Sequence, residues 1–176
     1  MSIIDKWHSL DDSNKFLIAY PFWFLLLFGV FYWGTYWSMS PIGHYLDTLQ
    51  RDIIMSVLDS TLDNQIQNFD IVINSKYHVV ITPECNGFVP YYIYLAGVLA
   101  YSCTLKRKVI YGVVGYFIFT VVNLIRLYVV TQIVNKYGAD YFFLAHDIGG
   151  NLLLIITGMS IFWLYLKGCT KVRYAK

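Results

Sequence analysis

Long apolar stretches alternate with short charged ones along this chain. Each apolar stretch is close to the ~20 residues with which a helix, rising about 1.5 Å per residue, crosses about 30 Å of hydrocarbon. The pattern predicts an all-α membrane protein with four transmembrane helices in a single membrane domain, residues 1–176. Four stretches with at most one charged residue mark the expected spans: 16–37, 87–103, 109–134 and 148–166.

Residues 38–86, between the first two spans, show two other periodicities. Apolar residues recur there at steps of three and four, which predicts an amphipathic helix on the outer membrane surface or capping the bundle. The apolar positions are Ile42, Leu46, Leu49, Ile53 and Val57, while Asp47, Arg51, Asp52 and Asp59 take other faces. Over residues 69–81 the apolar positions alternate instead, which predicts a short β-hairpin with its turn at Asn74-Ser75.

Composition and charge agree with a membrane protein and give its orientation. Hydrophobic residues make up 57% of the chain and charged ones 14%, against roughly 25% charged in soluble proteins. The loop at Lys106 to Lys108 and the C-terminal tail are basic, whereas residues 38–86 carry two basic and six acidic residues. Because basic loops stay in the cytoplasm, both termini are expected inside and segment 38–86 outside. The first apolar stretch is too long for a signal-peptide core and lacks a cleavage site, so it is expected to be a retained anchor.

Of the three cysteines, only Cys85 is expected at the outer face. Cys103 and Cys169 fall at the cytoplasmic side, so neither can form a disulfide with Cys85. An unpaired thiol in an oxidising compartment suggests a use, and the start of the following helix would lower its pKa. The alternative is that Cys85 is a small buried hydrophobe.

Arg126 is the only formally charged residue within the four expected spans. A central membrane Arg costs roughly 2.5–3.5 kcal/mol on insertion scales. Counting from Val109, a rise of about 1.5 Å per residue puts it about 25 Å across, in the outer leaflet with Cys85. Asn123, three residues earlier, shares its helix face and can hold the guanidinium. The alternative is an Arg that only reaches lipid headgroups.

His146 precedes the last span and is therefore expected at the outer face as well. An imidazole there can accept a thiol proton and later deliver it to a leaving amine. His44 and His78 are also outside and remain rivals, although their patterns favour solvent exposure. Asp147 adjoins His146, but neighbouring residues seldom face each other, so no triad is predicted. No metal-binding motif occurs.

These residues resemble the motifs of a known family. The Cys, Asn-x-x-Arg and His motifs of the exosortase/archaeosortase family are similar, in the same order over residues 69–166, to Glu84-Cys85-Asn86-Gly87, Asn123-Leu124-Ile125-Arg126 and His146. Asn86 stands where the family more often has Ser, Thr or Ala. The chain is also shorter than the eight-span members, so it is similar to the short, four-span forms.

The resemblance implies a cysteine protease/transpeptidase of the bacterial inner membrane, with its active site facing outward. Its substrates would be exported proteins ending in a short motif, a transmembrane helix and a basic tail, passed through an acyl-thioester to an unknown acceptor, without cofactor or nucleic acid. The implied catalytic residues are Cys85, Arg126 and His146, and the supporting residues are Asn123, Glu84, Asn86 and Gly87. Glu84 would oppose thiolate formation if ionised, or it could bind substrate or stabilise the loop.

A different class of function stays open on the sequence. In a non-catalytic scaffold for envelope assembly, Arg126 and Asn123 would only lock helices together. A thiol oxidoreductase would need a second outer cysteine, which the expected topology does not provide.

Overall fold

The computed structural model describes residues 10–32, 40–62, 65–67, 69–74, 77–82 and 85–174, which form helices and one small sheet. The α-helices are α2 (Asp12–Tyr32), α3 (Pro41–Thr61), α4 (Phe88–Ala100), α5 (Leu105–Tyr137) and α6 (Asn151–Tyr174). Between α5 and α6 lie a 3₁₀-helix, η3 (Ala139–Tyr141), and a π-helix, η4 (Phe143–Gly150). The strands are β1 (Gln65–Gln67), β2 (Asp70–Asn74) and β3 (Tyr77–Val80).

Three helical segments in the described part of the chain are long and apolar enough to cross a membrane: Asp12–Phe31, Leu105–Tyr137 and Ala139–Cys169. The protein is therefore a multi-pass membrane protein, as its hydropathy predicts. The predicted span over 87–103 is shorter than expected, because α4 has 13 residues and a helix of that length is about 20 Å long.

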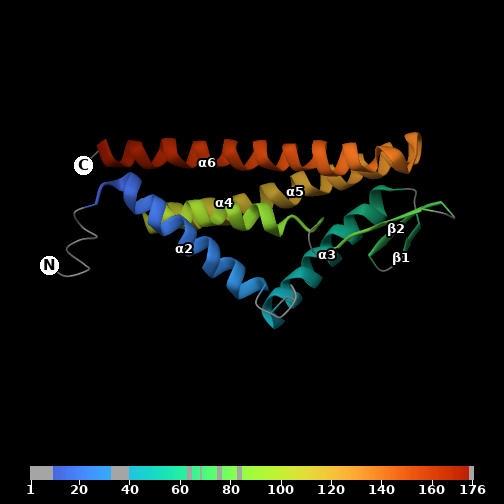
Figure 1. Cartoon of the computed structure of the whole chain (residues 1–176), viewed down its shortest axis with the longest axis horizontal. Helices are drawn as coiled ribbons and strands as arrows, with labels where there is room; N and C mark the ends of the chain where they lie inside the picture. Colours follow the sequence, from blue (N-terminus) through green and yellow to red (C-terminus); the bar gives the residue numbers. More distant parts are fainter. Residues whose placement is uncertain are drawn as a thin grey trace.

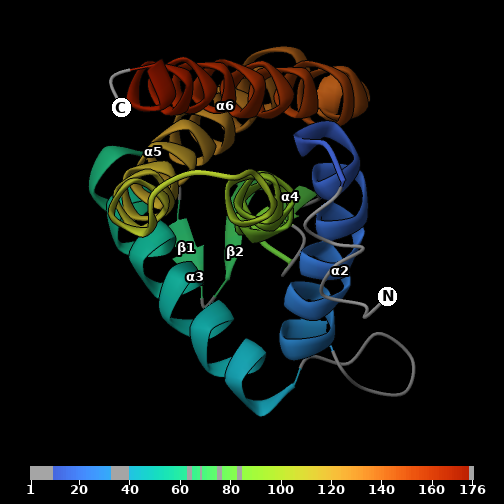
Figure 2. The same ribbon diagram turned by 90° about the vertical axis from the view of Figure 1, so that its left-hand side faces the viewer.

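Helix α4 lies at the centre of the bundle, with α2, α5 and α6 around it (Figure 2). Tyr94 and Val98 of α4 pack with Phe119 of α5 and with Leu154 and Tyr165 of α6 in one buried cluster. Tyr165 also donates a hydrogen bond from its hydroxyl to the carbonyl of Val98, at 3.0 Å. The short helix α4 is thus packed against both α5 and α6 through apolar and aromatic side chains.

The basic end of the bundle is fastened by a covalent bond and by polar contacts. Cys103, after α4, and Cys169, on α6, form a disulfide, so Cys85 is the one free cysteine that the described residues include. Arg107 Nη1 donates to the carbonyl of Gly168 at 2.8 Å. Lys108 Nζ donates to the carbonyl of Leu99 at 2.5 Å. The start of α5 is therefore tied to the ends of both α4 and α6.

The predicted hairpin is present at the other end of the long helices (Figure 1). Strands β2 and β3 are antiparallel with Ile71 opposite Val79, and β1 adds a third strand beside β2 that the sequence pattern does not predict. Of the two residues of the expected turn, Asn74 is the last residue of β2, opposite Tyr77, and Ser75 lies outside the described residues. Ile71 and Ile81 pack with Leu58 of α3 and Leu127 of α5, which joins the sheet to the bundle close to Cys85.

Helix α3 has the predicted amphipathic pattern, but its apolar stripe faces outward. Ile42 is 60% exposed and Ile53 47%, whereas the opposite face, with Asp47, Gln50 and Ile54, is buried against the protein. In a bilayer the outward stripe has lipid as its partner. Asp47 and Gln50 are therefore part of the protein interior, together with Ile54.

Candidate active site

Cys85 lies immediately before α4, in a short segment fixed by its neighbours. Gly87, the N-cap of α4, has φ of 84°, a conformation that glycine adopts without a steric penalty. A Cβ at Gly87 would also lie 3.2 Å from Asn123 Cβ. The absence of a side chain at Gly87 therefore allows this backbone to pack closely against Asn123. Glu84 lies outside the described residues.

Asn86 is completely buried and holds this segment in two directions. Its Oδ1 accepts a hydrogen bond from the amide of Phe88 at 2.8 Å, which satisfies a free amide at the start of α4. Its Nδ2 donates to Asp47 Oδ1 at 2.6 Å. Asp47 also pairs with Arg51 at 2.6 Å, and the Arg51 guanidinium lies 4.0 Å from the centre of the Phe69 ring. A buried carboxylate of α3 thus anchors the residue next to the thiol.

Asn123 and Arg126 extend from α5 toward Cys85. Asn123 Nδ2 donates to the Cys85 carbonyl at 2.8 Å, and Asn123 Oδ1 accepts from Arg126 Nη1 at 3.3 Å. One amide therefore positions both the backbone of the cysteine and the guanidinium, as expected for two residues three apart on one helix face.

The π-helix η4 presents His146 to Arg126 and Cys85. Arg126 Nη2 lies 3.0 Å from His146 Nε2 and donates to the His146 carbonyl at 3.3 Å. It also donates to Asn151 Oδ1 at 3.2 Å. Because a guanidinium can only donate, His146 Nε2 must offer its lone pair, and the imidazole proton is then on Nδ1. π-Helical turns inside helices often occur at functional sites.

Asp147 contacts His146, which contradicts the expectation that the two neighbours would not face each other. His146 Nδ1 lies 2.9 Å from Asp147 Oδ1. The carboxylate therefore accepts a hydrogen bond from Nδ1–H and fixes the tautomer of His146 that carries its proton on Nδ1. The expectation assumed an ordinary α-helix, whereas these residues occupy a π-helix with a wider turn. Phe142 stacks on the imidazole with the ring centres 4.9 Å apart and keeps its plane in place.

The thiol of Cys85 lies against the imidazole. Its Sγ is 3.4 Å from His146 Nε2 and 3.5 Å from the hydroxyl of Thr82, which donates to it. Partial burial raises the pKa of Cys85. The hydrogen bonds with His146 and Thr82, and the positive charges of protonated His146 and of Arg126, outweigh that effect and lower the pKa below its ordinary value.

Cys85, Arg126 and His146 are thus brought together, whereas His44 and His78 are both exposed. Sequence reasoning missed three other contributors, Asp47, Thr82 and Asn151. Asn151 follows His146 by five residues, one π-helical turn, but no sequence signal marks that turn. Within the described residues, no cluster of His, Cys, Asp and Glu could hold a metal ion.

The fold and this cluster define a multi-pass membrane protein in which a thiol, an imidazole and a guanidinium meet near one end of the helices. The family model described as transmembrane exosortase matches residues 13–164, and the chain belongs to this family. A search of curated proteins and a search of solved structures each gave no match.

The lowered pKa of Cys85 predicts a pH dependence of its alkylation. In a Cys103→Ser/Cys169→Ser background Cys85 is the only thiol, and its alkylation rate should reach half-maximum at a pH below that of a free thiol, since the thiolate is the reactive form. His146→Ala should move this midpoint upward, because it removes a hydrogen bond and a charge that lower the pKa. His44→Ala, in an exposed position, should leave it unchanged. Identical midpoints with and without His146 would contradict the assignment.

The buried carboxylate of Asp47 predicts a loss of stability on substitution. Asp47→Ala leaves the Asn86 amide and the Arg51 guanidinium without their partner, which should lower the free energy of unfolding by about 1–3 kcal/mol. Asp52→Ala, on the exposed side of the same helix, should change it by no more than about 0.5 kcal/mol. Unfolding in detergent measures both, and equal effects would show that the Asp47 contacts contribute nothing specific.

Proposed function

We propose that this protein is a membrane-embedded cysteine protease/transpeptidase. It cleaves the C-terminal sorting signals of exported proteins at the outer face and transfers them through an acyl-thioester to an acceptor. The observation that supports this most directly is the distance of 3.4 Å from Cys85 Sγ to His146 Nε2, with Arg126 Nη2 3.0 Å from the same nitrogen. Membership of the transmembrane exosortase family agrees with it.

In the first half of the reaction, Cys85 attacks the carbonyl carbon of the scissile peptide bond while its proton passes to His146 Nε2. An S–C bond forms, and the carbonyl electron pair moves onto the oxygen, whose negative charge Arg126 stabilises. The intermediate then collapses: the C–N bond breaks, and His146 returns its proton to the departing amine. The exported protein remains on Cys85 as a thioester.

In the second half, an acceptor nucleophile attacks the thioester carbon while His146 removes the acceptor's proton. The S–C bond breaks, the acyl group leaves on the acceptor, and the proton returns to the Cys85 sulfur. Asp147 maintains the tautomer of His146 that this cycle needs, because it accepts a hydrogen bond from the Nδ1–H group. Asn123 positions Cys85 and Arg126 relative to each other.

We also propose four membrane crossings, with both termini in the cytoplasm and the cluster facing outward from a bacterial inner membrane. Asn123, which contacts Cys85, lies 18 residues after the first residue of α5, a rise of about 27 Å. Residues 85–104 therefore return across the same depth, although α4 alone is too short to do so. In this orientation the Cys103–Cys169 disulfide faces a reducing compartment, so we expect it to be reduced to two thiols in growing cells.

A scaffold without catalytic activity is the alternative class. It accounts for Arg126 and Asn123 as a helix lock, but it gives no role to a free thiol placed against an imidazole whose tautomer is fixed. The protease and the scaffold differ in the expected effect of Cys85→Ala: it should abolish cleavage of a substrate by a protease, whereas it should leave a scaffold functional.

Processing of a reporter tests the proposal. The reporter is an exported protein followed by a C-terminal signal with a short motif, an apolar span and a basic tail, taken from a protein encoded beside this one. Cys85→Ala, Arg126→Ala and His146→Ala should each lower cleavage by roughly 10²-fold or more, with normal accumulation in the membrane. His78→Ala, an exposed histidine, serves as the matched control.

The thioester is the second readout. Wild-type enzyme stopped during turnover should carry the exported part of the reporter on Cys85 through a bond that hydroxylamine cleaves. Full processing by the Cys85→Ala variant would rule out this mechanism and leave the scaffold as the better description.

A further inference from the structure

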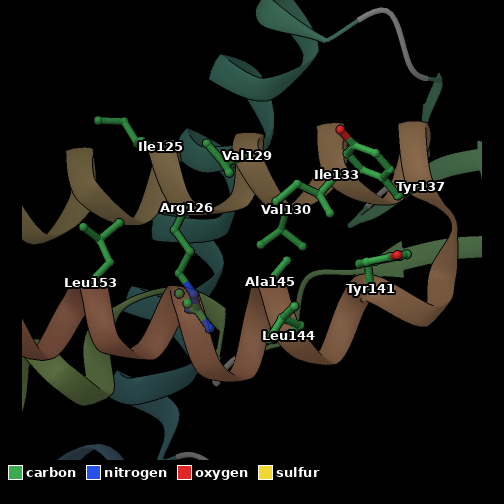
Figure 3. A pocket seen from close by; sticks show the side chains of 12 residues that line it. Ile125, Arg126, Val129, Val130, Ile133, Tyr137, Tyr141, Leu144, Ala145 and Leu153 are labelled. Atoms are coloured by element: carbon green, nitrogen blue, oxygen red, sulfur yellow. The ribbon is translucent and has the colours of Figure 1, made fainter.

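A large pocket lies beside the thiol, imidazole and guanidinium cluster, between α5 and the η3–η4 segment. Its volume is about 610 Å³, within the range of ligand-binding pockets. Figure 3 shows α5 along one side and η4 with the start of α6 along the other. The lining is almost entirely apolar or aromatic: Ile125, Arg126, Val129, Val130, Ile133, Tyr137, Tyr141, Leu144, Ala145, Gly149, Gly150 and Leu153.

The pocket has one charged end and one aromatic end. Arg126 lies toward one end, and Tyr137 and Tyr141 lie at the other, where the chain turns from α5 into η3 (Figure 3). Eleven residues of helix separate Arg126 from Tyr137, a length of about 16 Å, which an extended peptide covers with about five residues. In the proposed orientation the tyrosine end faces the outside, and the arginine end lies at the depth of Cys85.

Arg126 makes its end of the pocket suited to a peptide oxygen. The side chain is only 5% exposed, and the bonds of its two terminal nitrogens within the described residues go to amide, carbonyl and imidazole acceptors and to no carboxylate. Gly150 is essential to this arrangement, because a Cβ there would overlap Arg126 Nε. A buried charge so placed favours an occupant that brings an oxygen on which negative charge can develop.

We propose that this pocket binds the apolar side chains that immediately precede the scissile bond of the exported protein, and so selects which sorting signals are cut. The inference rests on the proposed function and orientation. A segment that enters at Tyr137 and Tyr141 and follows the pocket inward reaches Arg126, and with it His146 and Cys85. Because it comes from the outer side, it is the part that stays with the thioester. We expect the side chains of this segment to be apolar, because the walls of the pocket are apolar.

The charge distribution distinguishes this occupant from a phospholipid. A lipid carries its phosphate at the end nearer to water and its acyl chains toward the bilayer centre. The pocket has its cation at the deep end and its tyrosines at the outer end, the reverse of what such a lipid requires. A peptide with apolar side chains matches the apolar walls of the pocket, and the reacting carbonyl at its inner end lies near the Arg126 end.

Narrowing the pocket tests the proposal. Ala145→Phe and Val129→Phe add bulk to opposite walls, while Val121→Phe adds the same bulk to a valine of α5 that does not line the pocket. Val129 and Val121 are 45% and 54% exposed, so the two substitutions are closely matched. Ala145→Phe and Val129→Phe should lower cleavage of the reporter roughly 10-fold or more, and Val121→Phe should leave it unchanged.

A substrate series then separates recognition from general damage. The apolar residues just before the cleaved bond of the reporter are replaced by alanine. This change should lower the cleavage rate of the wild-type enzyme. The cleavage rate of Ala145→Phe should fall by a much smaller factor, compared with its own rate on the unchanged reporter. The pH profile of Cys85 alkylation should be the same in Ala145→Phe as in the wild type. Equal losses for both enzymes, or undiminished cleavage by both pocket variants, would overturn the proposal.

Photocrosslinking identifies the occupant directly. A benzoylphenylalanine placed at Leu144 of the Cys85→Ser variant should crosslink to reporter residues on the exported side of the cleaved bond. Crosslinks only to lipid, or only to the transmembrane part of the reporter, would overturn the pocket assignment. Failure of the proposed function is a separate result, namely full cleavage of the reporter by Cys85→Ala.

Discussion

The arrangement of this molecule depends on one buried cation. The Arg126 guanidinium donates to Asn123 on its own helix, to the ring and carbonyl of His146, and to Asn151 at the start of α6. A guanidinium between membrane helices is costly, and its hydrogen bonds offset part of that cost. The same bonds that lower this cost bring α5 and η4 together, and Asn123 extends the network to the backbone of Cys85.

A second polar network supports the first from the other side. Asp47 accepts a hydrogen bond from Asn86, and Asn86 accepts one from the first amide of α4, three residues after the cysteine. Because Asp47 belongs to α3, whose opposite face is an exposed apolar stripe, the position of the thiol depends on a helix that packs on the rest of the protein through one face only.

The sequence predicts the features that arise from burial averaged over many residues. Hydropathy locates the long helices, and the alternation of apolar and polar residues locates β2 and β3. The free-energy cost of placing a charge in a membrane helix singles out Arg126. What it misses depends on individual contacts. Asp147 contacts His146 within a π-helix, a local backbone form that no residue pattern in the sequence marks. Asp47 resembles the other acidic residues of its helix, and only tertiary packing separates a buried carboxylate from solvated ones. Helix α4 ends at Ala100, and residues 101–104 form the connection to α5.

The shared position of His146 Nε2 has a consequence for the resting protein. The lone pair that must accept the thiol proton is also the acceptor for Arg126 Nη2. While the site is empty, two donors therefore compete for a single acceptor. A carbonyl oxygen that accepts the hydrogen bond of the guanidinium leaves this lone pair to the thiol alone. The arrival of such an oxygen thus directs the ring toward the sulfur.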